Sequence, residues 1–119
     1  MTTFDFGFGK VPAHQHANGG GWVADTAEVA AAAYIGPNAQ VSGGAQVSGN
    51  AQVFGGAHVS GDAWVSGNAQ VFGGAWVSGN AQVFGDARVF DNAWVFDDAQ
   101  VSGNAQVSDN ARVSGDARL

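Results

Sequence analysis

A six-residue repeat without insertion or deletion constrains the fold of this chain more than any other feature. From Ala39 to Asp116 the sequence divides into thirteen hexapeptides of the form A-x-V-[SF]-[GD]-[GND], and looser copies extend the register back to Gly21. Alanine and valine stand two positions apart, so in an extended chain both side chains point to the same side. The last two positions hold Gly, Asn or Asp, which tolerate the left-handed backbone conformation of a tight bend. Each unit is therefore predicted to be a short strand followed by a corner.

This pattern excludes a helix and favours stacked coils. A helical turn of about 3.6 residues does not fit a period of six, and Gly, Asn and Val are poor helix formers. One unit cannot bury its Ala–Val face alone, whereas stacked coils bury that face and pair their backbone groups with the coils on either side. The sequence therefore predicts an all-β solenoid over residues 21–119, preceded by an N-terminal cap segment over residues 1–20.

The repeat resembles the hexapeptide-repeat family. The signature of that family is an aliphatic residue, a small or acidic residue, two free positions, a small residue and a free position, and "IGPNAQ" (35–40) and "VSGNAQ" (47–52) match it. The resemblance covers residues 21–119 and implies a left-handed parallel β-helix of triangular section, with three hexapeptides in each coil and about 5.5 coils. It also implies a relation to acyltransferase-like solenoids and to phage or bacterial hexapeptide proteins. From Val41 onward, however, the residue after the valine is always Ser or Phe.

With three hexapeptides in each coil, every eighteenth side chain would join one column along the solenoid. Two columns are rich in aromatic residues, and they are expected to flank one corner of the prism. We call this set the aromatic corner; it comprises Phe54, His58, Phe72, Trp76, Phe90 and Trp94. The core behind its first face is expected to contain Val41, Val59, Val77 and Val95.

The aromatic corner has two interpretations that are compatible with each other. Stacked outward rings can stabilise the coils by ladder contacts, as cross-strand pairs do in sheets. Large apolar patches on a protein surface also mark interfaces, whose cores are rich in Trp and Phe. We expect a homo-oligomer, and the resemblance favours a trimer of parallel prisms.

The segment before the repeat is expected to act as a cap, because the open end of a solenoid presents unpaired backbone. Its start, "FDFGFG", places three phenylalanines on one side of an extended chain, namely Phe4, Phe6 and Phe8. The opening "MTTFDFGFGK" shows no basic region followed by an apolar stretch, so no signal peptide is predicted. The expected location is cytoplasmic or virion-associated.

Charge and composition argue against several partner classes. The net charge is −6, from ten acidic and four basic residues, which does not suit a nucleic acid partner. No apolar run approaches the ~20 residues of a membrane-spanning helix, so no membrane partner is expected. The absence of cysteine excludes disulfides and thiolate metal sites.

The histidines are the candidates for chemistry. His14 and His16 have a spacing that occurs in metal sites, but a solvated pair in a cap is the favoured interpretation. His58 stands within the repeat, and hexapeptide acyltransferases use a histidine as general base. No inserted loop builds a substrate cleft here, so His58 is favoured as one rung of the aromatic column. No cofactor and no metal are expected.

Three functions follow, in order of preference. The first is a non-enzymatic structural or interaction solenoid that self-assembles through the aromatic corner. The second is an acyltransferase of the hexapeptide class, with His58 as the candidate base. The third is ligand recognition on a flat face, either of carbohydrate stacked on Trp76 and Trp94 or of ice by the serine columns. Fold alone does not decide among them.

Overall fold

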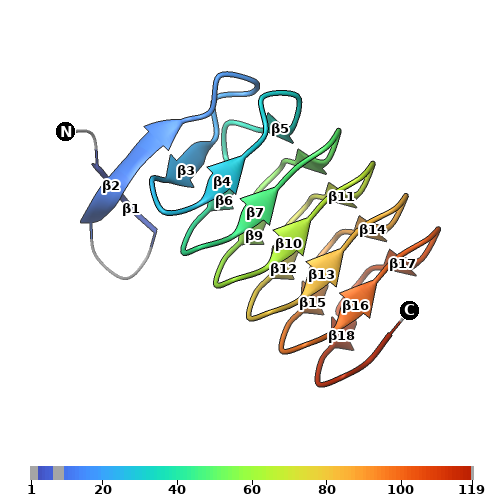
Figure 1. Ribbon diagram of the computed structural model, residues 1–119. Coiled ribbons are helices and arrows are strands. Elements are labelled where there is room, and N and C mark those ends of the chain that lie inside the picture. Colours follow the sequence, from blue (N-terminus) through green and yellow to red (C-terminus); the bar gives the residue numbers. More distant parts are fainter. Residues whose placement is uncertain (1–2, 7–9, 119) are drawn as a thin grey trace.

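The computed structural model describes residues 3–6 and 10–118 (Figure 1). Within these residues the chain forms eighteen β-strands and no helix, and consequently no helix that could cross a membrane. From residue 22 onward the strands repeat in a cycle of three, and each cycle makes one coil of a solenoid. The predicted all-β solenoid is confirmed.

The strands form three parallel stacks, one for each face of the prism. The first face holds β3 (Trp22–Ala24), β6 (Gln40–Val41), β9 (His58–Val59), β12 (Trp76–Val77), β15 (Trp94–Val95) and β18 (Arg112–Val113). The second holds β4 (Glu28–Val29), β7 (Gln46–Val47), β10 (Trp64–Val65), β13 (Gln82–Val83) and β16 (Gln100–Val101). The third holds β5 (Tyr34–Ile35), β8 (Gln52–Val53), β11 (Gln70–Val71), β14 (Arg88–Val89) and β17 (Gln106–Val107).

Neighbouring strands in each stack are three hexapeptides apart in the sequence, as predicted. Trp76 pairs with Trp94 on the first face, and Val77 pairs with Val95 beside it. The chain thus makes about 5 turns, with about 18 residues per coil. The left-handed sense that the resemblance implies stays a prediction.

The interior contains the alanines and valines of the repeat. Val41, Val59, Val77 and Val95 are all fully buried, and so are the alanines that precede them in each unit. Small side chains suit this interior because three strands of one coil meet across a narrow section. The core is therefore a continuous column of apolar side chains, and its burial provides the main driving force for stacking.

Hydrogen bonds between coils satisfy the backbone. The N–H of Trp76 donates to the carbonyl of Ala93 at 3.0 Å, and the N–H of Ser78 donates to the carbonyl of Val95 at 2.9 Å. The same pattern recurs on all three faces, so each coil serves as a template for the next. Because these bonds fix the register, side chains that share a repeat position lie directly above one another.

The corners require a left-handed backbone conformation at the fifth position of the repeat. Gly79 has a φ of 64°, and a Cβ there would lie 2.9 Å from the backbone nitrogen of Asp97 in the next coil. Asp97 itself has a φ of 58°. Its carboxylate accepts a hydrogen bond from the N–H of Gly115 at 3.2 Å, which offsets part of the cost of that conformation.

The segment before the repeat extends the sheet of the first face. β1 (Thr3–Asp5) and β2 (Lys10–Gln15) form an antiparallel pair, and β2 pairs antiparallel with β3. The ring of Phe4 stacks on Trp22 with centroids 4.7 Å apart, and Phe6 meets Phe4 edge-on at 4.8 Å. Phe8 lies outside the described residues. The added strands therefore cover the edge of β3 that faces the N-terminal end of the solenoid.

Residues after β2 also cover the first strand of the third face. The imidazole of His16 is buried, and its Nε2–H donates to the carbonyl of Ala33 at 2.8 Å. The N–H of Ile35 donates to the carbonyl of Asn18 at 3.0 Å, and the N–H of Gly21 donates to the carbonyl of Ile35 at 2.9 Å. These bonds satisfy backbone groups at the N-terminal edge of β5.

Candidate functional site

The first-face column is a continuous stack of flat side chains. His58 and Trp76 have centroids 5.0 Å apart with planes 7° from parallel, and Trp76 and Trp94 follow at 5.2 Å and 6°. The guanidinium of Arg112 lies 5.2 Å from the centroid of Trp94, in cation–π geometry. The spacing of the ring centroids follows from the distance between coils, because each ring occupies the same repeat position as the ring in the neighbouring coil.

A second stack runs along the end of the third face. Phe54 and Phe72 are parallel within 2° at 4.9 Å, and Phe72 and Phe90 are parallel within 4° at 5.0 Å. Tyr34 meets Phe54 edge-on at 6.4 Å at the N-terminal end of the stack. These phenylalanines directly follow β8, β11 and β14, at the bend that leads to the first face.

The aromatic corner therefore consists of two separate ladders on either side of a turn. In the part of the chain that the structure describes, no ring contact joins a phenylalanine of one ladder to a ring of the other across the turn. Trp76 and Trp94 are 42% and 39% exposed, whereas His58 and the three phenylalanines are only partly exposed. Trp76 and Trp94 are therefore the most exposed rings of the aromatic corner.

The ring faces in the first-face column are already occupied. Trp76 lies between His58 and Trp94, and Trp94 lies between Trp76 and Arg112. Only the ring edges point to solvent, so a sugar cannot stack on either indole face without displacing a neighbour. This geometry disfavours carbohydrate stacking on Trp76 and Trp94, and it fits the ladder interpretation.

The second face carries an isolated tryptophan. Trp64 is 48% exposed, more than the tryptophans of the first face. Its neighbours in register are Gln46 and Gln82, so no aromatic ring stands directly above or below it. The same repeat position therefore produces a ladder on one face and a lone ring on another.

The histidines take three different roles. The Nδ1–H of His58 donates to the carbonyl of Gly56 at 2.9 Å, while the ring stacks on Trp76. His14 is exposed and pairs with Asp25 at 2.8 Å between Nδ1 and Oδ1. His16 is buried against Ala33 instead, so the two cap histidines do not converge on one point. Within the described part of the chain, no three His, Cys, Asp or Glu side chains form a group that could hold a metal ion.

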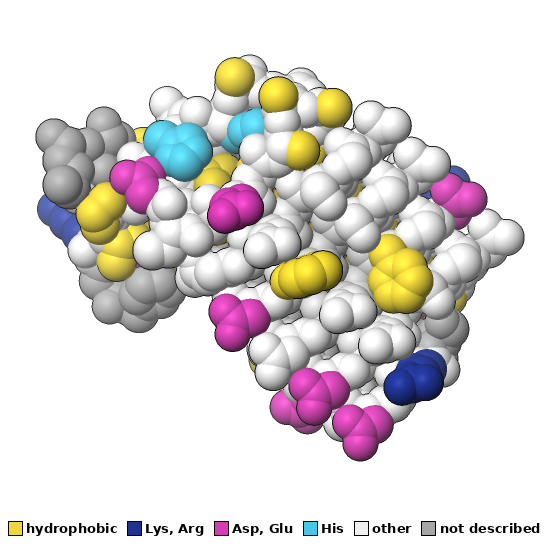
Figure 2. Space-filling model, in the orientation of Figure 1, with side chains coloured by type: hydrophobic (Ala, Val, Ile, Leu, Met, Phe, Trp, Pro, Cys, Tyr) yellow, Lys and Arg dark blue, Asp and Glu magenta, His cyan; other side chains and the backbone are white. Residues whose placement is uncertain are grey.

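Acidic side chains gather along the edge between the first and second faces, which is the lower edge in Figure 2. This edge carries Asp62, Asp97, Asp98 and Asp116 at its turns. One of these, Asp98, accepts a hydrogen bond from the side chain of Asn80 in the preceding coil at 3.4 Å. Four of the ten acidic residues thus lie at this edge, whereas Asp91 and Asp109 lie at the turn between the third and first faces, within the aromatic corner.

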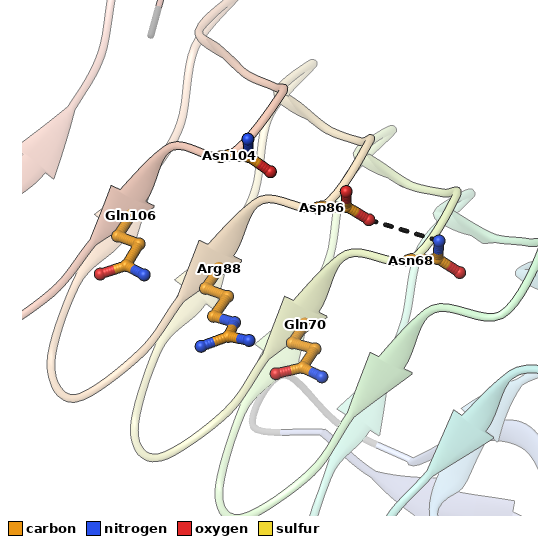
Figure 3. Close-up of a pocket in the computed structure, with 6 residues that line it drawn as sticks. All are labelled: Asn68, Gln70, Asp86, Arg88, Asn104 and Gln106. Atoms are coloured by element: carbon orange, nitrogen blue, oxygen red, sulfur yellow. Dashed lines mark hydrogen bonds between the residues drawn. The ribbon is translucent and has the colours of Figure 1, made fainter.

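The third face contains a polar groove that the sequence reasoning missed. It lies between two rows of side chains that follow the solenoid axis (Figure 3). We call this feature the third-face groove; it is lined by Asn68, Gln70, Asp86, Arg88, Asn104 and Gln106. A signal was present in "GDARVF" (85–90), where both rows change from amide to charged residues within one unit.

Comparisons with known proteins support the repeat. Residues 45–61, 81–97 and 105–119 match the family described as the YdcK beta solenoid repeat. The three matched segments together make up less than half of the chain, and each belongs to the regular part of the solenoid. No curated protein and no solved structure matches the chain. The comparisons therefore agree with the solenoid architecture and carry no activity with them.

Proposed function

We propose that this protein is a non-enzymatic interaction solenoid that self-assembles through its aromatic corner. The observation that carries the proposal is the exposure of Trp76 and Trp94 on a rigid column, at 42% and 39%. A side chain of that size exposes apolar surface to water at a cost that burial against a second copy would remove.

Stacking makes these tryptophans suited to an interface. Each indole is held between two flat neighbours, so its rotamer is fixed before any partner arrives. Binding then loses little side-chain entropy, and pre-organised aromatic residues are the ones that dominate interface energies. The four carboxylates of the acidic edge lie at a different corner, whereas Asp91 and Asp109 lie at the turn between the two ladders, so they would have to stay at the solvent-exposed rim of the proposed interface.

A trimer of parallel prisms is the arrangement we favour. The repeat resembles the hexapeptide-repeat family, in which such trimers are common, and parallel packing would bring equivalent columns of three chains side by side. Hydrophobic columns along one corner suit this symmetry, because a closed ring buries the same patch on every copy.

The native mass tests the proposal. Replacing Phe72, Trp76, Phe90 and Trp94 with Ser or Gln should reduce the mass in sedimentation equilibrium to that of one chain, while the β-sheet circular dichroism signal persists. Trp64→Gln is the matched control, because it removes an indole that is more exposed still, from a face outside the proposed interface. An unchanged mass in the fourfold variant, or a monomeric parent, contradicts self-assembly through this corner.

An acyltransferase of the hexapeptide class is the second candidate, and one observation favours it. The carbonyl of Gly56 fixes the proton of the neutral His58 ring on Nδ1, which leaves Nε2 with a lone pair as a general base requires. Titration of the purified protein with acetyl-coenzyme A distinguishes the two candidates. Saturable binding together with acyl transfer that His58→Gln abolishes would support the enzyme, and absence of both would leave the interaction solenoid.

A further inference from the structure

The third-face groove is a built feature of the fold. Gln70, Arg88 and Gln106 project from β11, β14 and β17, and the shorter side chains project from the turns before these strands (Figure 3). Between the two rows lie Ala69 and Ala87, whose side chains point into the core and are fully buried. The groove therefore runs along the axis, and successive rungs lie about 4.8 Å apart.

The middle rung carries a pair of opposite charges. Asp86 stands on one wall and Arg88 on the other, whereas the rungs on either side have amides at both places. Asp86 accepts a hydrogen bond from the side chain of Asn68 at 3.3 Å. The guanidinium of Arg88 has no hydrogen bond or ion pair with any of the residues that the structure describes, although Asp86 is only two positions away.

The backbone at the floor of the groove has no free N–H group over residues 68–70 and 86–88, so side chains must supply the hydrogen-bond donors for a ligand there. The N–H groups of Gln70 and Arg88 donate to the carbonyls of Ala87 and Ala105 at 2.9 and 3.0 Å. Those of Asn68 and Asp86 donate to Gly85 and Gly103 at 2.8 Å. Since these backbone donors are already used between coils, a ligand would meet amides, one guanidinium and one carboxylate.

We propose that the third-face groove binds a straight, uncharged oligosaccharide lying along the solenoid axis across three coils. Sugar hydroxyl groups both donate and accept hydrogen bonds, and so do the side-chain amides of Asn and Gln. Arg88 supplies donors on one wall of the middle rung and Asp86 supplies acceptors on the other. An extended β-1,4-linked chain carries hydroxyls along both edges, which matches two parallel rows of partners.

Charge favours an uncharged glycan over an acidic one. Asp86 and Arg88 cancel within the groove, and the whole chain carries a net charge of −6. A polyanion would gain one contact to Arg88 and would meet the field of a negatively charged protein. This groove lies on a different face from the ring stack of Trp76 and Trp94, whose covered faces disfavour sugar stacking there.

An NMR titration of the full chain with cellotetraose tests the proposal. Amide shifts should be confined to residues 68–70, 86–88 and 104–106. Arg88→Gln should weaken binding about tenfold, as loss of a charged hydrogen bond predicts, and Asp86→Asn should weaken it about threefold. Both changes introduce the residue that neighbouring rungs already carry, so the fold should be retained.

Arg118→Gln is the matched control, since it removes the same charge from the second-face column and should leave the affinity unchanged. Cellotetraose shifts that are absent, that map to another face, or that Arg88→Gln does not alter would overturn the proposal. Tighter binding of tetragalacturonate than of cellotetraose would overturn the assignment to an uncharged glycan. None of these outcomes depends on the oligomeric mass, so failure here leaves the proposal of self-assembly untouched.

Discussion

The first and second faces of the solenoid use one repeat position in two different ways. On the first face the outward position holds His58, Trp76 and Trp94 in succession, and their rings stack at 5.0 and 5.2 Å. On the second face the same position holds Trp64 between Gln46 and Gln82. The backbone geometry is alike on both faces, so the difference arises only from which residue stands at the equivalent position of the next coil.

This difference shows what a solenoid adds to an exposed aromatic residue. A lone indole on the surface gains little from the fold and exposes about half of its area. The neighbours of a stacked indole cover both of its ring faces. Such an indole also gains the energy of aromatic pairing, which a sheet provides only where the register places rings on adjacent strands opposite each other. The ladder is therefore a property of the column and not of any single tryptophan.

The largest effect should come from removing the scaffold that both faces share. Val77→Asp places a carboxylate in the fully buried Ala–Val core behind Trp76. Burial of an unpaired charge costs more than ~4 kcal/mol, which is comparable to the whole stability of a small domain. We expect no cooperative thermal unfolding in circular dichroism. A melting transition near that of the parent would show that the interior tolerates charge and would contradict the role of the buried apolar column as the main source of stability.

A smaller effect should separate the ladder from the lone ring. Trp76→Gln removes two stacking contacts, with His58 and Trp94, and should lower the free energy of unfolding by about 1–3 kcal/mol. Trp64→Gln removes a more exposed indole with no ring beside it and should change stability by less than ~0.5 kcal/mol. Urea unfolding of both variants measures the difference at a protein concentration where all are monomeric. Equal losses would mean that stacking contributes nothing beyond the burial of each side chain.

The smallest effect should come from building a ladder where none exists. Gln82→Trp places a second indole directly above Trp64 in the register of β10 and β13. A new stacked pair should raise the free energy of unfolding by about 0.5–1.5 kcal/mol. Gln100→Trp is the matched control, because its neighbours in register are Gln82 and Arg118, neither of which is an aromatic ring. A gain in the control equal to that in Gln82→Trp would attribute the effect to added apolar area rather than to stacking.

The sequence predicts the regular part of this fold because its period is local and its interactions repeat. Each hexapeptide contains the residues that form its strand, its corner and its inward-facing Ala and Val. The burial of Val77 and the bend at Gly79 can therefore be predicted from their own hexapeptide. Once a coil of eighteen residues is assumed, the sequence also predicts that the rings of the aromatic corner form columns along the solenoid. Their division into two ladders that do not touch across the turn could not, because it depends on the direction in which each side chain leaves the corner.

The third-face groove and the cap required the structure. Asp86 and Arg88 are two positions apart, and only the coordinates show that they line opposite walls without pairing. The cap histidines look alike in "HQH", yet His14 meets Asp25 at the surface and His16 is buried against Ala33. Non-repeating residues have no copies above or below them to set their register, so their contacts are decided by packing alone.

By itself, therefore, the sequence determined a stack of strands and corners with small residues inside and one column for each outward position. The tertiary structure decided which rings touch, which charges stay apart and how the first coil is covered. The physical reason is that backbone register follows from a local period, whereas contacts between side chains of different columns depend on distances that arise only when the coils are closed.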